Sequence, residues 1–194
     1  MKNLKEVRER FVKPLKMKIY PSVPADFLRD GILFFDNSAL VALINHEDVF
    51  GKLINEFREL RCSFAIIPSL FFEFTRTDSV ANYNKRVHFL KNHIDMIYPV
   101  EKDNAQLKEL TVVLQRVKPQ LSYTDFLLHC CMYKFRDKGF VITENHRDFS
   151  LELLDRKYII TVEDDKNSQI RNTAIYSLNI DKFNKAAENI LKEK

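Results

Sequence analysis

Hydrophobic residues occur along the chain in short blocks that predict a strand followed by one or more helices. Residues 32–35 are all large and apolar, as in parallel strands covered on both faces, and this run stops at Asp36. Apolar residues then recur every three or four positions from 38 to 60, which predicts a helical crossover. A second apolar run, residues 62–67, is followed by Pro68, and a helix is expected to continue from there through residue 75.

The later blocks continue this alternation of helices and strands. We expect helices over 80–98, 103–117, 126–135, 149–154 and 182–191, and strands over 140–143, 158–162 and 174–180. Strands joined by helices make right-handed crossovers, which build parallel sheets. The sequence therefore predicts an α/β fold with a central, mostly parallel twisted sheet, in which sites form at the carboxyl ends of the strands.

The chain is expected to form one main domain with two terminal additions. Residues 30–162 contain the first four predicted strands, and residues 163–194 add a strand and a helix packed on the same domain. Residues 1–29 are a basic N-terminal extension, predicted as a short helix over 3–13 and an irregular stretch through Pro24. Its first twenty residues carry seven Lys or Arg and two Glu. Such a run either contacts nucleic-acid phosphates or forms a solvated helix face.

The composition is that of an ordered, soluble protein. Of the 194 residues, 45% are apolar and 30% are charged, which suffices for one substantial core. No apolar run reaches the length of about 18 residues that a membrane span requires, and the N-terminus is charged, unlike a signal peptide. We therefore expect a cytoplasmic protein without a membrane segment. The three cysteines lack CxxC spacing, which favours reduced thiols in the core.

Two acidic residues in the first half of the chain are candidates for chemistry. Asp36 ends a buried strand, where it either caps the following helix or takes part in a site. Glu73 lies in a predicted helix between Phe72 and Phe74. A carboxylate in such surroundings either turns toward solvent or is compensated by a cation or by hydrogen bonds.

Three further candidates follow in the second half of the chain. Asp125 is the fourth residue of Ser122-x-x-Asp125 before an apolar helix, a variant of the capping box. The same position also directs a carboxylate toward the strand ends, where Asp36 is expected. Asn145 and Asp148 follow the predicted strand 140–143, and each of them either makes a turn, caps a helix or contributes to a metal site.

Taken together, Asp36, Glu73 and Asp125 follow three different apolar elements that are expected to converge on one edge of the sheet. Neighbouring carboxylates repel one another, so that their pKa values rise unless a divalent cation neutralises them. Oxygen ligands favour Mg²⁺ or Mn²⁺ over Zn²⁺. The pattern therefore predicts a site for Mg²⁺ or Mn²⁺.

Four short motifs over about residues 30–160 resemble the PIN-domain family, and within it the VapC-like endoribonuclease toxins. The motifs are Phe34-Phe35-Asp36-Asn37-Ser38, Ile67-Pro68-Ser69-Leu70-x-x-Glu73, Asp125-Phe126-Leu127-Leu128 and Val141-Ile142-Thr143-Glu144-Asn145-His146-Arg147-Asp148-Phe149. The resemblance implies a three-layer α/β/α PIN-like fold and metal-dependent hydrolysis of RNA phosphodiester bonds. It also implies an RNA substrate, an antitoxin as partner, and a homodimer.

By this resemblance, Asp36, Glu73 and Asp125 carry over as catalytic and metal-binding acids, with Ser38 and Thr143 as supporting polar residues. The fourth acidic position falls either on Asn145, a neutral residue, or on Asp148. The substrate-contacting residues are not predicted. Among the histidines there is no HxxxH or HExxH spacing, and His146 is the one that neighbours the predicted site, where it could contact a phosphate.

Two other functions are compatible with parts of the pattern. A haloacid-dehalogenase-like phosphatase would use Asp36 as nucleophile, Thr143 to bind phosphate and Asp164 with Asp165 to hold Mg²⁺. It would require a second acid at position 38, where the chain has Ser38, and it leaves Glu73 and Asp125 without roles. The other alternative is a PIN-like module that binds RNA or a protein without cleaving.

Overall fold

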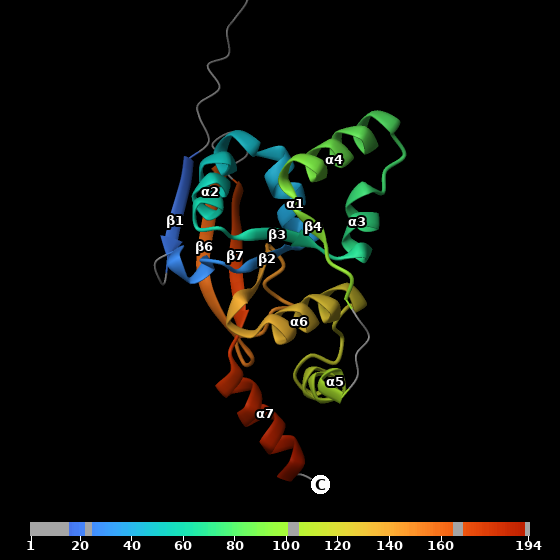
Figure 1. Cartoon of the computed structure of the whole chain (residues 1–194), viewed down its shortest axis with the longest axis vertical. Helices are drawn as coiled ribbons and strands as arrows, with labels where there is room; N and C mark the ends of the chain where they lie inside the picture. Colours follow the sequence, from blue (N-terminus) through green and yellow to red (C-terminus); the bar gives the residue numbers. More distant parts are fainter. Residues whose placement is uncertain (1–15, 22–24, 101–104, 165–168, 193–194) are drawn as a thin grey trace, which may run out of the picture.

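Seven strands form one sheet in the order β1-β6-β7-β5-β2-β3-β4 in the computed structural model, which describes residues 16–21, 25–100, 105–164 and 169–192 (Figure 1). The strands are β1 (Lys16–Pro21), β2 (Ile32–Phe35), β3 (Ser63–Ile66), β4 (Met96–Ile97), β5 (Gly139–Thr143), β6 (Leu154–Asp164) and β7 (Gln169–Leu178). The α-helices are α1 (Asn37–Asn45), α2 (Glu47–Glu59), α3 (Pro68–Thr75), α4 (Val80–His93), α5 (Ala105–Val117), α6 (Tyr123–Phe135) and α7 (Ile180–Lys192), and two 3₁₀ turns are Ala25–Leu28 and Arg136–Lys138.

Four neighbouring strands, β4, β3, β2 and β5, pair in parallel and confirm the α/β prediction. Helices α1 and α2 connect β2 to β3, α3 and α4 connect β3 to β4, and α5 and α6 return the chain to β5 on the other side of β2. Because crossovers are right-handed, this reversal places α5 and α6 on the opposite face from α1 to α4, as Figure 1 shows. The strand order therefore reverses between β2 and β5, and such a switch point is where sites form in α/β sheets.

Local sequence explains where the elements beside this switch point begin and end. Strand β2 buries Leu33 and Phe34 completely, which stabilises it as a central strand. Helix α1 begins immediately afterwards, because Asp36 has extended backbone and its carboxylate caps the helix. Helix α3 begins with Pro68 in its first turn, and helix α6 begins after the N-cap Ser122, which accepts from the Asp125 amide as in a capping box.

The core is rich in aromatic residues that join the two helical layers to the sheet. The Phe34 ring lies 5.8 Å from that of Tyr98 and 5.9 Å from that of Phe135. Behind α6, His129 stacks on Phe149 with ring centroids 5.0 Å apart. The three cysteines are buried and free, as predicted. No helix in the described parts of the chain is long and apolar enough to cross a membrane.

The other half of the sheet differs from the sequence prediction. Strands β6 and β7 form an antiparallel pair, β7 pairs antiparallel with β5, and β1 pairs antiparallel with β6. The helix expected over 149–154 is absent, because residues 151–153 form turns that lead into β6. An apolar run predicts a strand but not its direction, and the short connection between β6 and β7 permits only a hairpin.

The N-terminal and β4 segments also differ from expectation. Residues 16–21 form edge strand β1 and are not part of an irregular stretch, whereas the helix expected over 3–13 lies outside the described residues. The helix expected over 80–98 ends at His93, and the two-residue strand β4 follows it. A strand as short as Met96–Ile97 has no periodicity that a sequence could display.

Candidate active site

Asp36 lies at the switch point between β2 and β5 and is held by three hydrogen bonds. Its side chain is only 7% exposed. Oδ1 accepts from the Asn37 backbone amide at 2.7 Å, and Oδ2 accepts from Ser38 Oγ at 2.7 Å and Thr143 Oγ1 at 2.6 Å. The carboxylate therefore has a fixed orientation at the ends of two neighbouring strands.

The two hydroxyl groups that support Asp36 are themselves tied to the backbone after β5. Ser38 Oγ accepts from the Glu144 amide at 2.9 Å, and Thr143 Oγ1 accepts from the Asn145 amide at 2.8 Å. Each hydroxyl has one hydrogen, and the shorter contacts of Ser38 Oγ and Thr143 Oγ1 are both with Asp36. The two hydroxyl oxygens also lie 3.1 Å apart, within the same hydrogen-bond network. Ser38 and Thr143 thus lie where the sequence predicted polar support.

Glu73 is joined to this network through Asn37. The Asn37 side-chain amide donates from Nδ2 to Glu73 Oε1 at 2.9 Å, so one residue contacts both acids. Asn37 Oδ1 is buried and has no hydrogen-bond partner among the described residues. Glu73 itself is exposed, which leaves its second oxygen accessible to solvent or ligand.

Asp125 lies in the first turn of α6 and is 6% exposed. Ser122 Oγ donates to Asp125 Oδ2 at 2.5 Å, while the Asp125 amide donates back to Ser122 Oγ at 3.1 Å. The predicted capping role of this pair is therefore confirmed. It does not account for the burial of the carboxylate, because an exposed aspartate would serve the helix equally well.

Asp148 and Asn145 are placed differently from each other. Asn145 Nδ2 donates to Asp148 Oδ2 at 2.7 Å, so the amide orients the carboxylate. Asp148 acts electrostatically on Asp125, as do Asp36 and Glu73. Of the two residues considered for the fourth acidic position, Asp148 is thus the one that adds negative charge beside the other three acids.

These four acids form one electrostatic group, which we call the acidic cluster: Asp36, Glu73, Asp125 and Asp148. Burial, and next the negative charges of Asp36, Asp148 and Glu73, raise the pKa of Asp125 to about 6, although its hydrogen bond with Ser122 acts in the opposite direction. No Lys, Arg or His among the described residues forms an ion pair with a member of the acidic cluster. Its negative charge is therefore not compensated by those side chains.

The donor set of the acidic cluster fits a hard divalent cation in its chemistry. Every donor is an oxygen, and the buried Oδ1 of Asn37 adds a neutral oxygen without a partner among the described residues. Across the same described ranges, no three His, Cys, Asp or Glu side chains stand close enough together to form a ready-made metal centre. Mg²⁺ commonly keeps several waters and takes only one or two carboxylates directly, so these residues fit an ion held partly through water.

Neighbouring titratable residues have other roles. His146 Nδ1 lies 2.9 Å from Tyr176 Oη and Nε2 lies 2.8 Å from the Asn172 carbonyl, so both nitrogens are engaged and the predicted phosphate contact is not favoured. Burial lowers the pKa of His129 to about 4, and its Nδ1 lies 2.8 Å from the Asp125 carbonyl. Burial raises the pKa of Glu144, which faces Arg171 and Thr173 and is also affected by Asp36.

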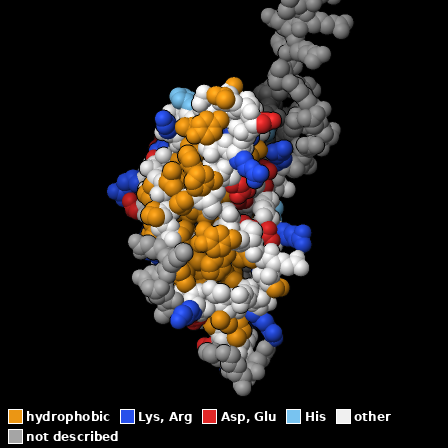
Figure 2. All heavy atoms as spheres, turned by 90° about the vertical axis from the view of Figure 1, so that its right-hand side faces the viewer, with side chains coloured by type: hydrophobic (Ala, Val, Ile, Leu, Met, Phe, Trp, Pro, Cys, Tyr) orange, Lys and Arg blue, Asp and Glu red, His pale blue; other side chains and the backbone are white. Residues whose placement is uncertain are grey.

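Exposed hydrophobic side chains lie on the helices around the acidic cluster. Phe72 and Tyr123, which lie one and two residues from Glu73 and Asp125 in sequence, are 71% and 66% exposed. Figure 2 shows hydrophobic side chains gathered along this side of the molecule, next to a group of acidic ones. The surface around the acidic cluster thus combines negative charge with exposed rings.

Sequence reasoning did not identify Asn37 as a site residue. An asparagine directly after a strand-ending aspartate resembles an ordinary helix start, and its contact with Glu73 spans 36 residues.

Comparison of the chain with protein-family models, curated proteins and solved structures found no match.

Proposed function

We propose that the chain is a metal-dependent endoribonuclease with a PIN-like fold that hydrolyses RNA phosphodiester bonds at the acidic cluster. The observation that carries the proposal is the placement of Asp125, a buried carboxylate whose pKa is raised by burial and by three other carboxylates. Burying uncompensated negative charge is costly, and proteins retain such arrangements mainly where a cation or a reaction requires them.

Asp36, Asp125, Asp148 and Glu73 would hold Mg²⁺ or Mn²⁺, with Asn37 Oδ1 as a further oxygen. When bound, the cation supplies charge stabilisation on the phosphate and lowers the pKa of water. Asp36 is the most rigid of these groups, since three donors fix its two oxygens. It is the group best suited to fix the position of the scissile phosphate, through the cation, relative to the sheet edge.

The remaining acids suit the handling of water and protons. Glu73 is exposed and held through one oxygen by Asn37, so its second oxygen can orient an attacking water. Asp125 lies beside the other carboxylates and would be ionised with a cation bound, so it is a second possible acceptor for a proton of that water. Asn145 keeps Asp148 directed toward the cluster through its 2.7 Å hydrogen bond.

The four sequence motifs support the same assignment, because they resemble the PIN-domain endoribonucleases and include all members of the acidic cluster. On this basis we also propose a cytoplasmic toxin with an antitoxin partner, acting as a homodimer.

A dehalogenase-like phosphatase fits the strand register less well. That phosphatase would need Asp164 near Thr143. Ala174 of β7 pairs with both Thr143 and Ile159, so Ile159 is level with Thr143, and Asp164 lies five residues, or about 16 Å, farther along β6. Asp165 lies outside the described residues.

The direct test is cleavage of single-stranded RNA with Mg²⁺ by the wild-type chain and by Asp36→Asn, Asp125→Asn and Asp148→Asn. We expect each substitution to lower the rate by more than about 100-fold, while circular dichroism shows an unchanged fold. Asp137→Asn, which changes an exposed acid next to α6, serves as the matched control and should cleave normally. Cleavage that survives all three substitutions, or a chelator, would contradict the proposal. Hydrolysis of an aryl phosphate that requires Asp36 but not Asp125 would instead favour the phosphatase.

A further inference from the structure

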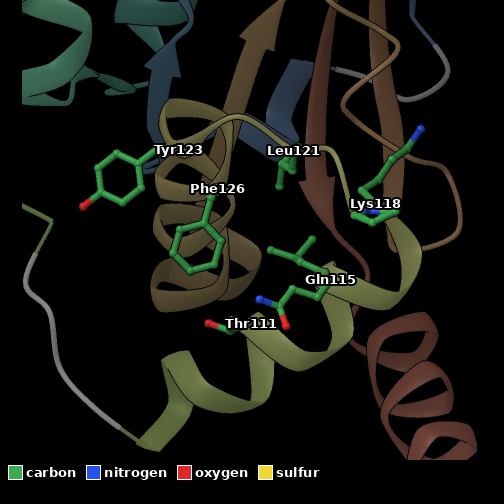
Figure 3. Close-up of a pocket in the computed structure, with 8 residues that line it drawn as sticks. Thr111, Gln115, Lys118, Leu121, Tyr123 and Phe126 are labelled. Atoms are coloured by element: carbon green, nitrogen blue, oxygen red, sulfur yellow. The ribbon is translucent and has the colours of Figure 1, made fainter.

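A pocket of about 330 Å³ lies between α5 and α6, beside the turn that carries Asp125. It is lined by the last turns of α5, the connection to α6, and the first turns of α6. Figure 3 shows the principal lining side chains, which are Thr111, Gln115, Lys118, Leu121, Tyr123 and Phe126. The volume lies at the small end of the range for small-molecule pockets.

The walls of the pocket suit a flat, polar-edged ring. Tyr123 and Phe126 are three residues apart on α6 and so share one side of the helix, and Tyr123 is 66% exposed. Aromatic side chains in this arrangement provide a surface on which nucleobases stack. Leu121 adds apolar contact beside them, so the pocket can take up the face of a base without polar cost.

Polar groups around the pocket are free to bind a ligand. In the described part of the chain, nothing hydrogen-bonds the side-chain amide of Gln115, and Figure 3 shows this amide turned toward the space near Phe126. The Lys118 ammonium forms no ion pair with the described residues and extends at the opposite end of the pocket. An amide can donate to and accept from a base edge, and an unpaired ammonium attracts phosphate.

The pocket lies beside the helical turn that carries Asp125, although no member of the acidic cluster lines it. Tyr123 and Asp125 belong to the same helical turn, with Tyr123 facing solvent and Asp125 buried toward Asp36. An RNA strand with one phosphate at the acidic cluster would therefore bring a neighbouring nucleotide to the pocket. We propose that the α5–α6 pocket binds a nucleobase of single-stranded RNA next to the scissile phosphate, an inference that rests on the proposed nuclease function for the placement of that phosphate.

The test uses the fact that the chain contains no tryptophan. Tyr123→Trp, introduced into an Asp36→Asn chain to prevent cleavage, places a single fluorophore at the pocket. Tyr83→Trp in the same background is the matched control, since Tyr83 is an exposed tyrosine on α4. The probes are an eight-nucleotide single-stranded RNA and an abasic ribose-phosphate oligomer of equal length, with binding measured separately by anisotropy of an end label.

We expect the RNA to quench the indole fluorescence of the Tyr123→Trp chain but not that of the Tyr83→Trp chain, and the abasic oligomer to quench neither. We also expect Tyr123→Ala to weaken RNA binding by about 5- to 100-fold, as for the loss of one stacked base. Three results would overturn the proposal: no RNA binding, RNA binding without quenching in the Tyr123→Trp chain, and equal quenching of that chain by the abasic oligomer. If the pocket fluorophore is quenched selectively but the wild-type chain does not cleave RNA, the pocket is supported and the nuclease function fails.

Discussion

Asn37 Nδ2 donates to Glu73 Oε1 over 2.9 Å, while the Asn37 backbone amide donates to Asp36 Oδ1 over 2.7 Å. One residue at the start of α1 thus connects an acid at the end of β2 with an acid inside α3. Asn37 and Glu73 are 36 residues apart in the chain, so this contact is what fixes Glu73 relative to the rigid Asp36. The Asn37 side-chain oxygen is buried and has no hydrogen-bond partner in the described residues.

Asn37→Ala should therefore slow RNA cleavage without unfolding the chain. Because Glu73 loses its only described hydrogen bond, we expect the rate to fall by about 10- to 100-fold, as for other residues that orient metal ligands. The measurement is the single-turnover cleavage rate, with thermal unfolding as a check on the fold. Asn84→Ala, which removes an exposed asparagine on α4, should leave the rate unchanged. A normal rate in Asn37→Ala would show that Glu73 does not depend on this contact.

Thr143→Val should affect both stability and activity. The threonine is completely buried, donates to Asp36 Oδ2 and accepts from the Asn145 amide, so the isosteric change leaves two buried groups with one partner fewer. We expect unfolding free energy to fall by about 1–3 kcal/mol and RNA cleavage to slow. Urea denaturation and the cleavage rate measure the two effects. Thr161→Val, which removes a hydroxyl bonded to Asn172 on β6–β7, should lower stability but preserve cleavage.

The metal-free protein should respond to pH through Asp125. Its pKa of about 6 in the folded chain lies above the ordinary 3.8, so the folded state retains a proton that the unfolded state loses as pH rises from 4 to 6. This carboxyl therefore lowers stability progressively over that interval and by a constant amount above pH 6, at most about 3 kcal/mol. Asp125→Asn removes the penalty, and in a chelator it should be more stable than wild type at pH 7.5 by about 1–3 kcal/mol.

A second buried residue, His129, titrates in the same pH range, so the effect of Asp125 is measured as the difference in stability between wild type and Asp125→Asn. Burial lowers the pKa of His129 to about 4, so the unfolded state binds the extra proton below pH 6.5, and this group raises stability as pH increases from 4 to 6.5. The two residues have opposite slopes, but His129 is present in both proteins and cancels in their difference. Urea denaturation at pH 4, 5, 6 and 7.5 should show the difference growing with pH. An Asp125→Asn protein less stable than wild type at pH 7.5 would contradict the placement of the acids.

Helix α7 should depend on the ion pair between Lys182 and Asp155. Burial tends to raise the pKa of Asp155, but hydrogen bonds from Lys182, Asn179 and Lys157 outweigh it and lower the value to about 2. Lys182 Nζ also donates to the Leu151 and Leu154 carbonyls. Because these groups are partly exposed, we expect Lys182→Met to cost about 1–2 kcal/mol at pH 7.

The Asp155 contribution has a predictable pH dependence. A lowered pKa adds stability that is complete above pH 4 and is lost as pH falls toward 2. The stability difference between wild type and Asp155→Asn, measured by urea denaturation, should therefore shrink between pH 4 and pH 2. Lys185→Met, which changes an exposed lysine on the same helix, should have little effect at any pH. An unchanged difference down to pH 2 would exclude this role.

The parts of the fold that the sequence predicted are those in which one local signal is sufficient. The apolar run ending at Asp36 defined β2 and the cap of α1, and Ser122 with Asp125 defined the start of α6. Parallel pairing of the strands then brought those ends to one edge of the sheet. The direction of β6 and β7 was not predicted, because their apolar runs look alike in parallel and antiparallel pairs.

The sequence and its motifs pointed to the acids of the site and to the polar residues Ser38 and Thr143, but not to the other site residues. Charge conspicuously placed among apolar residues pointed to Asp36, Glu73 and Asp125, but the choice between Asn145 and Asp148 depends on the electrostatic effect of Asp148 on Asp125, which only the fold creates. The same holds for Asn37, whose partner is distant in sequence, and for the pocket at Tyr123 and Phe126, whose ring positions are equally typical of a core.

The most direct test of the acidic cluster is a calorimetric titration of Mn²⁺ into the metal-free chain at pH 7.5, with Asp125→Asn and Asp137→Asn titrated in parallel. We predict saturable binding at millimolar concentration or below to the wild type and to Asp137→Asn, and binding at least about 10-fold weaker to Asp125→Asn. Absence of binding to the wild type at millimolar Mn²⁺, or equal binding to all three proteins, would contradict a metal-binding role for the acidic cluster.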